Sequence, residues 1–196
     1  ENGKLAGVEA TDWSWGGLLT DLENDSRKDL YIVNGYKRDV TNLDYMTYVR
    51  DSIEQSGGVN PTRYPDVNEF LKIIPSVPQR NYLYRNRCDL TFADVTEAWG
   101  LPERSFSNGS AYGDLDGDGD LDLVVNNIQS AAFVYENQSQ DLPDAHYLQV
   151  QLRGPAQNPL GIGASVRIEY DTTLQYLEMS PTRGFFSSST SHNTLC

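Results

Sequence analysis

The segment GDLDGDGDLDLVV, residues 113–125, places five aspartates within nine residues and then continues into an apolar run. Like charges at this spacing repel one another, so a folded protein concentrates them only where something offsets the repulsion. The pattern D-x-D-x-D-G-x-x-D lets a loop turn its carboxylates toward one hard cation, and calcium takes about 6–8 oxygen ligands. The predicted metal-binding residues are Asp114, Asp116, Asp118, Asp120 and Asp122.

Two details refine this predicted metal loop. Gly119 at the sixth position permits a sharp turn, and Asp120 at the seventh would contribute its backbone carbonyl, leaving its side chain free. The opening of the loop is that of an EF-hand, but an EF-hand needs a Glu at the twelfth position and a helix on each side. The twelfth residue is Val125, and LDLVV is typical of a buried strand. The sequence therefore predicts a calcium loop that leads into a strand.

A second acidic loop lies upstream, in the segment TDLENDSRKDLYIVNG, residues 20–35. The preceding segments also align, with Ser14 and Gly16 matching Ser107 and Gly109, so the sequence holds an internal repeat. The corresponding metal-binding positions are Asp21, Glu23, Asp25, Arg27 and Asp29. Because a Glu replaces an Asp and Ser26 replaces the turn glycine, we expect this copy to bind a cation more weakly. The alternative, a solvated acidic turn, is stronger for this copy than for residues 114–122.

Composition excludes several classes of function. With 28 acidic and 15 basic residues the net charge is −13, which argues against binding to nucleic acid or to an anionic membrane surface. The hydrophobic content of 38% is typical of a globular protein, and no apolar run approaches the roughly 18–20 residues of a membrane span. The sequence does not begin with Met, which predicts an excerpt of a longer protein. Pairing of the only two cysteines, Cys88 and Cys196, stays open.

Outside the two loops the pattern changes from helical to β. Apolar residues recur at helical spacing over residues 44–55 and 66–74, which predicts two short amphipathic helices. They lie in an expected insertion between strands of neighbouring repeats. After residue 128, alternating segments such as HYLQVQLRG and ASVRIEY predict strands with one buried face, the start of a small β domain. The two histidines, His146 and His192, are isolated, and no catalytic constellation can be assembled around them.

These motifs resemble a known family. The aspartate loop before a short strand is similar to the calcium loop of FG-GAP (VCBS) repeats, which form the blades of integrin-α-like β-propellers. The segment NYLYRNRCDLTFADVTEAWGL, residues 81–101, resembles the linker strands of such repeats, with Cys88 where glycine is usual. The segments LQVQLRGPAQNPLGIGASVRIEY and SPTRGFFSSS resemble the ASPIC/UnbV domain that often follows these repeats. The combination looks like the large VCBS/ASPIC proteins of Bacteroidetes-type bacteria.

The expected fold is mainly β: partial FG-GAP propeller blades with a helical insertion, followed by a small β domain. We assign residues 1–36 to a first repeat, 37–80 to the insertion, 81–140 to a second repeat, and 141–196 to the start of an ASPIC/UnbV-like domain. A complete propeller has about 4–8 blades, so we expect missing parts of the protein to complete it.

The resemblance implies a calcium-binding module that is secreted or held at the cell surface, at the outer membrane or in the periplasm of a Gram-negative bacterium. The expected partner is a glycan or a protein. Two alternatives stay open: an enzyme acting on polysaccharides, such as a lyase or hydrolase, and a structural spacer of a larger surface protein. No catalytic residues are predicted.

Overall fold

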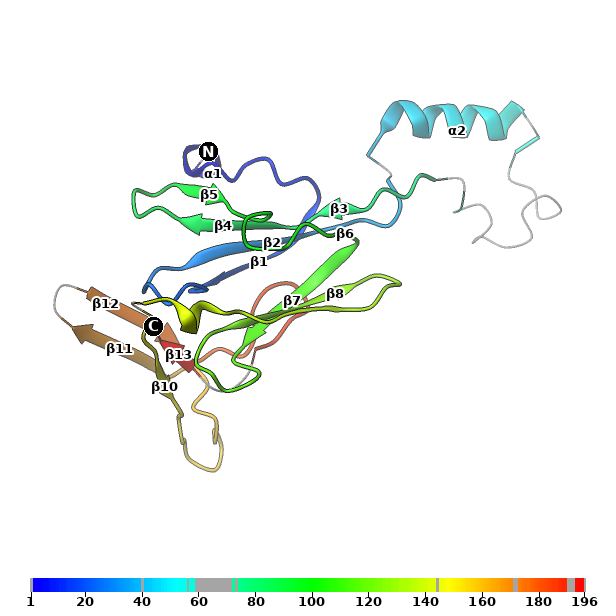
Figure 1. Ribbon diagram of the computed structural model, residues 1–196. Helices are drawn as coiled ribbons and strands as arrows, with labels where there is room; N and C mark the ends of the chain where they lie inside the picture. The colour runs from blue at the N-terminus through cyan, green and yellow to red at the C-terminus, as the bar shows by residue number, and fades with distance from the viewer. Residues whose placement is uncertain are drawn as a thin grey trace.

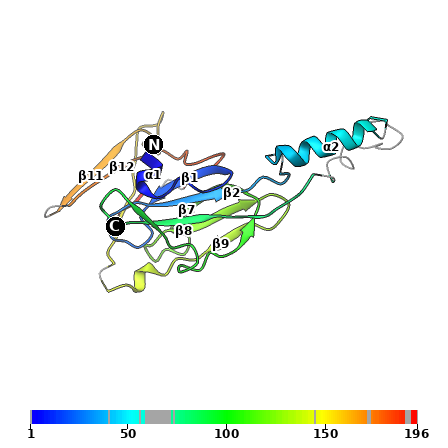
Figure 2. The same cartoon turned by 90° about the horizontal axis from the view of Figure 1, so that it is seen from above.

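The computed structural model describes residues 2–39, 41–55, 57–58, 72, 74–143, 145–170, 173–189 and 193–195, and Figures 1 and 2 show it from two sides. The fold is mainly β, as predicted. The helical elements of the described residues are α1 (Asn2–Ala6), α2 (Leu43–Gln55) and the 3-10 helix η1 (Ser139–Asp141). Helix α2 confirms the helix predicted over residues 44–55 and lies well away from the sheets (Figure 1). The helix predicted over residues 66–74 lies outside the described residues except at Lys72 and Ile74.

Two antiparallel sheets form the centre of the molecule. The first contains β1 (Ser14–Thr20), β2 (Asp29–Asn34), β4 (Tyr82–Asn86) and β5 (Phe92–Asp94), in the order β1-β2-β4-β5. The second contains β7 (Ser107–Gly113), β8 (Asp122–Asn127) and β9 (Phe133–Tyr135), in that order. Within each sheet, neighbouring strands pair antiparallel in chain order, as in a propeller blade.

The sequence repeat is also a structural repeat. In each sheet the first two strands form a hairpin closed by an acidic loop, with the same register and the same irregularity one residue after the first pair. The paired residues at the two ends of the hairpin are Ser14↔Asn34 and Thr20↔Asp29 in the first sheet, and Ser107↔Asn127 and Gly113↔Asp122 in the second.

The sheets group the strands differently from the predicted repeats. Strands β4 and β5 were assigned with the second repeat, but β4 pairs with β2, for example Leu30 with Tyr84. In the sheet, the insertion therefore lies between the second and third strands of the first blade. Local pattern could not reveal this, because it depends on pairing between residues 50 to 54 positions apart.

The core lies between the two sheets, where β1 and β2 pack against β7 (Figure 2). Its members are apolar side chains of the strands and of the residues flanking the acidic loops. They are Leu18, Leu22, Tyr31, Val33, Leu83, Leu101, Leu121, Leu123 and Val125. Because residues from both blades share this core, the two blades fold as one unit.

The remaining strands form small sheets. Strand β3 (Gln79–Arg80) pairs with β6 (Arg104–Ser105) beside the two blades. In the C-terminal part, β10 (Leu148–Val150) pairs with β13 (Asn193–Leu195), and β11 (Ser165–Tyr170) pairs with β12 (Thr173–Glu178). The alternating pattern of ASVRIEY thus correctly predicted a strand.

The C-terminal part packs on the first strands of both blades and explains the two repeated glycines. A Cβ atom at Gly16 would lie 3.2 Å from the backbone nitrogen of Phe185, and one at Gly109 would lie 3.2 Å from Ser187 Oγ. Ser187 Oγ also accepts a hydrogen bond of 3.0 Å from the backbone N–H of Ser110 in β7. The absence of side chains at these two positions therefore lets the segment around residues 184–187 approach both strands.

A buried network of polar side chains joins the two blades. Asn81 accepts a 2.9 Å hydrogen bond from the backbone N–H of Asn34 and donates one of 2.9 Å to Ser107 Oγ. Ser14 and Ser107 in turn donate to the side chains of Asn34 and Asn127, each over 2.8 Å. Buried polar groups of this kind are costly unless every member is satisfied, so the network specifies how the blades meet.

Removing the middle of this polar network should destabilise the fold. We expect Asn81→Ala to lower the free energy of unfolding by about 2–3 kcal/mol, because the Asn34 N–H loses its acceptor and Ser107 Oγ loses one of its donors. Asn126→Ala is the matched control: its amide bonds Asn108 at the exposed surface, and we expect a change within about 0.5 kcal/mol. Urea denaturation followed by fluorescence measures both, and equal losses would contradict the role of the polar network.

Candidate metal centre

The loop between β7 and β8 gathers three carboxylates. Oxygen atoms of Asp114, Asp116 and Asp118 all lie within 4.8 Å of one another. Backbone N–H groups hold each of them: that of Gly117 donates to Asp114 over 2.7 Å, and those of residues 118 and 120 donate to Asp116 and Asp118 over 3.3 and 3.2 Å. The cluster is thus shaped by the loop's own backbone, and its spacing suits a cation bound by oxygen ligands at about 2.3–2.6 Å.

The backbone conformation explains the two glycines of this loop. Gly117 has φ 84° and Gly119 has φ 98°, in the left-handed region that side chains rarely adopt. In the first loop Asn24 and Ser26 stand at the same places and keep left-handed φ values of 53° and 72°. The two loops therefore share a backbone path although their sequences differ.

Asp122 hydrogen-bonds two separate segments and holds them together, and we call it the clamp aspartate of this loop. One carboxylate oxygen accepts a 2.9 Å hydrogen bond from the N–H of Leu115 at the start of the loop, and the other accepts one of 2.9 Å from the N–H of Asn137. The side chain is buried. The ninth position of the pattern thus ties the loop to the segment that follows β9, while each oxygen keeps a second lone pair.

Asp120 departs from the expectation. Its side chain is fully buried, and Oδ2 accepts hydrogen bonds from the N–H of Gln140 over 3.2 Å and from Ser139 Oγ over 3.4 Å. The expectation of a free side chain is therefore wrong. Oδ1 has no hydrogen-bond partner among the described residues, and burial raises the pKa of this carboxyl to about 6. The segment that follows β9 folds back over the loop, and no sequence pattern predicts this contact.

The first loop repeats the clamp. Asp29 accepts hydrogen bonds from the N–H of Leu22 over 3.3 Å and from the N–H of Asn86 over 2.9 Å, as Asp122 does in the second loop. Burial raises the pKa of Asp29 to about 7. Asp21, at the start of the same loop, accepts from the N–H groups of Asp25 and Ser26, and burial raises its pKa to about 6.

The other acids of the first loop bind arginines. Glu23 forms a 2.6 Å ion pair with Arg85 of β4, and Asp25 forms one of 3.4 Å with Arg27. Within this loop, all of whose residues are described, no three carboxylates are gathered as in residues 114–118. Two guanidinium groups thus supply positive charge to this loop.

Two asparagines were missed by the sequence analysis. The Nδ2 atoms of Asn86 and Asn137 donate to the carbonyls of Lys28 and Leu121, which precede the clamps by one residue, over 3.1 and 3.2 Å. Their Oδ1 atoms accept from the N–H groups of Cys88 and Ser139. The signal existed in YLYRN and FVYEN, which are 51 positions apart. The two acidic loops are 93 positions apart in the sequence. The two spacings differ because the insertion separates the first acidic loop from Asn86 but has no counterpart in the second blade.

Both acidic loops contact the C-terminal part at their sixth position. The ring of Tyr147 packs so closely on Gly119 that a Cβ atom there would overlap it. In the first loop the Ser26 hydroxyl hydrogen-bonds Tyr170 over 2.8 Å and accepts from Gln175 Nε2 over 2.7 Å. The conformation of each loop is therefore coupled to the position of the C-terminal strands.

Comparison with known families agrees with this architecture. The family model for an FG-GAP-like repeat matches residues 70–125, and the model for ASPIC and UnbV matches residues 154–195. No curated protein matches the sequence. The FG-GAP match runs from the segment before β4 to the middle of β8, so the family's repeat takes the outer strands of one blade together with the inner hairpin of the next.

The matches confirm the predicted combination of an FG-GAP-like repeat with an ASPIC/UnbV domain. Repeats of this type are typical of extracellular proteins. Among the described residues, neither α1 nor α2 has the length and apolar character needed to cross a bilayer.

The burial of Asp120 leads to a prediction opposite to the one its loop position suggests. We expect Asp120→Ala to lower the free energy of unfolding by about 1–3 kcal/mol, because the N–H of Gln140 loses its buried acceptor. Asp141→Ala, at an exposed position of η1, is the matched control and should stay within about 0.5 kcal/mol. Thermal and urea unfolding in the presence of EDTA isolate this effect from metal binding. A neutral Asp120→Ala would show that the seventh side chain is dispensable.

Proposed function

From the FG-GAP-like repeat and the ASPIC and UnbV domain of this protein, we propose a calcium-binding extracellular module of a surface or secreted protein, with a glycan or protein as its ligand. The observation that supports the metal most directly is the cluster of Asp114, Asp116 and Asp118 in the loop between β7 and β8. Its role would be structural: the cation stabilises the blade that presents the binding surface.

The cation offsets an electrostatic cost. Three carboxylates whose oxygens lie within 4.8 Å repel one another, and the backbone N–H groups that hold them carry only partial charges. A divalent cation bound to the three would remove most of this repulsion and link folding to metal binding. Calcium fits better than magnesium, since calcium accepts many carboxylate ligands in irregular geometry while magnesium retains much of its water.

The acidic residues among the predicted metal ligands differ in the contacts that they already make. In loop 114–122, three aspartates form the cluster, Asp122 keeps free lone pairs beside its clamp contacts, and Asp120 is committed to Gln140. In loop 21–29, Asp29 is buried, Asp21 is half-buried, and Glu23 and Asp25 are paired with arginines. We therefore propose one principal calcium site at residues 114–122, with residues 21–29 as a weaker site or none.

The stability of the protein should depend on calcium. At a calcium concentration about 100 times the dissociation constant, binding adds about 2.7 kcal/mol, which corresponds to a rise in melting temperature of about 5–10 °C for a protein of this size. Differential scanning calorimetry with EDTA, then with added CaCl2 or MgCl2, measures this rise in melting temperature. An unchanged melting temperature on calcium addition would sink the metal proposal.

A substitution in the cluster locates the effect. Asp116→Asn keeps an oxygen that accepts from the N–H of Asp118 but removes one negative charge, so the calcium-dependent rise in melting temperature should shrink to less than half. Asp51→Asn, which removes an exposed charge on α2, should leave the rise intact. If both variants respond to calcium like the unmodified protein, the cation does not bind at residues 114–118.

A further inference from the structure

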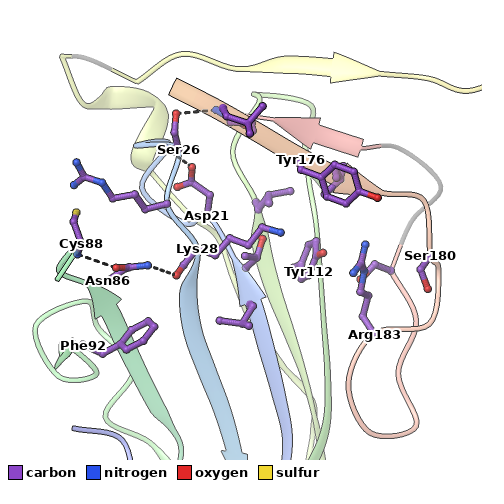
Figure 3. Close-up of a pocket in the computed structure, with 18 of the residues that line it drawn as sticks. Asp21, Ser26, Lys28, Asn86, Cys88, Phe92, Tyr112, Tyr176, Ser180 and Arg183 are labelled. Atoms are coloured by element: carbon purple, nitrogen blue, oxygen red, sulfur yellow. Dashed lines mark hydrogen bonds between the residues drawn. The ribbon is translucent and has the colours of Figure 1, made fainter. Parts of the chain in front are cut away.

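A pocket of about 570 Å³ lies where the first blade meets the C-terminal part of the protein (Figure 3). Its walls come from the end of β1 and the first acidic loop, from residues 86–92 between β4 and β5, from β7, and from β12 with the segment that follows it. The volume is in the range of small-molecule sites. It is separate from the aspartate cluster of residues 114–118, none of which lines it.

The charge of this pocket is opposite to that of the protein as a whole. Three cationic side chains line it, Arg27, Lys28 and Arg183, against one lining acid, although the net charge of the full sequence is −13. Lys28 and Arg183 form no ion pair with any residue that the structure describes. Arg183 is oriented by a 2.8 Å hydrogen bond from Nη2 to the carbonyl of Glu178, which leaves its other N–H groups for a ligand.

Aromatic and polar side chains complete the lining. Tyr176 is 54% exposed, and Figure 3 shows it with Tyr112 around the same space as Lys28 and Arg183. Gln175 and Ser180 add an amide and a hydroxyl. Aromatic faces supply apolar contact area, side-chain amides and hydroxyls bond hydroxyl groups, and free cations bind carboxylates or sulfates.

The walls are joined to one another. The Ser26 hydroxyl accepts from Gln175 Nε2 over 2.7 Å, and it hydrogen-bonds the Tyr170 hydroxyl over 2.8 Å, so the first acidic loop is tied to the hairpin β11–β12. On the other side, Asn86 binds the carbonyl of Lys28 over 3.1 Å (Figure 3). The pocket is therefore formed before a ligand arrives, which lowers the entropic cost of binding.

We infer that this pocket binds an anionic saccharide, with a sugar ring against Tyr112 and Tyr176 and its carboxylate or sulfate group on Lys28 and Arg183. The inference rests on the proposed ligand-binding function and names its ligand class, but it does not depend on calcium in residues 114–122. Carboxylated and sulfated sugars both carry the required anionic group, and the experiment tests each kind in turn.

The experiment is isothermal titration calorimetry of the full-length protein with trigalacturonate, with a sulfated disaccharide, and with neutral cellotriose. We expect binding of at least one anionic sugar and none of cellotriose. The double variant Lys28→Gln/Arg183→Gln should bind at least tenfold more weakly, because it removes two charge-assisted contacts. Lys4→Gln/Arg153→Gln removes the same charges from exposed positions outside the pocket and should bind normally. Matching melting temperatures establish that both variants are folded.

Cys88 supplies a second readout, because it is exposed, carries a free thiol and lines the same pocket. A bound sugar should slow its alkylation by iodoacetamide, followed by mass spectrometry of the Cys88 peptide. If the two double variants bind the sugar with equal affinity, the pocket is not the binding site and the saccharide binds elsewhere on the protein. Binding of a poly-glutamate peptide but of no sugar would overturn the ligand class. Absence of any binding would overturn the inference, whereas the calcium-dependent melting temperature tests the metal proposal separately.

Discussion

The two clamp aspartates, Asp29 and Asp122, hold the parts of each blade in place. Each stands at the first residue of a second strand and accepts backbone N–H bonds from its own loop and from the end of the third strand (Asn86) or the segment just after it (Asn137). A single carboxylate thus determines the path of the loop and the position of the outer strand together. The side chains of Asn86 and Asn137 add a second contact between the same segments, because each donates to the carbonyl of the residue that precedes the clamp aspartate.

The two blades share this arrangement of clamp aspartate and asparagine, but the negative charge of their acidic loops is offset differently. In residues 114–122 three carboxylates face one another, and the proposed calcium ion would neutralise them. In residues 21–29 the arginines Arg27 and Arg85 pair with two of the acids. In the first blade this backbone path is kept while side chains of opposite charge, one from the loop and one from β4, pair with two of the acids. Lys28 and Asp21 of this loop both line the pocket, and Lys28 forms no ion pair with a described residue.

The C-terminal part is integrated with the blades through small contacts at specific positions. It approaches β1 and β7 where Gly16 and Gly109 have no side chains, and it contacts both acidic loops at their sixth residues. The buried polar network through Asn81 and Ser107 joins the same two blades on their other side. The acidic loops, the packing of the blades and the walls of the pocket are consequently parts of one connected structure.

Local sequence pattern was sufficient to predict the loops, the strands that follow them, the repeat, helix α2 and the family. Ligand spacing, turn residues and apolar periodicity are all read within about twenty residues. Long-range packing, by contrast, places β4 and β5 in the first blade and buries Asp120 under Gln140. It also pairs Glu23 with Arg85 and gathers the cations in one pocket. Each of these features depends on groups far apart in the sequence, and a local pattern carries no information about which distant segment will supply the partner.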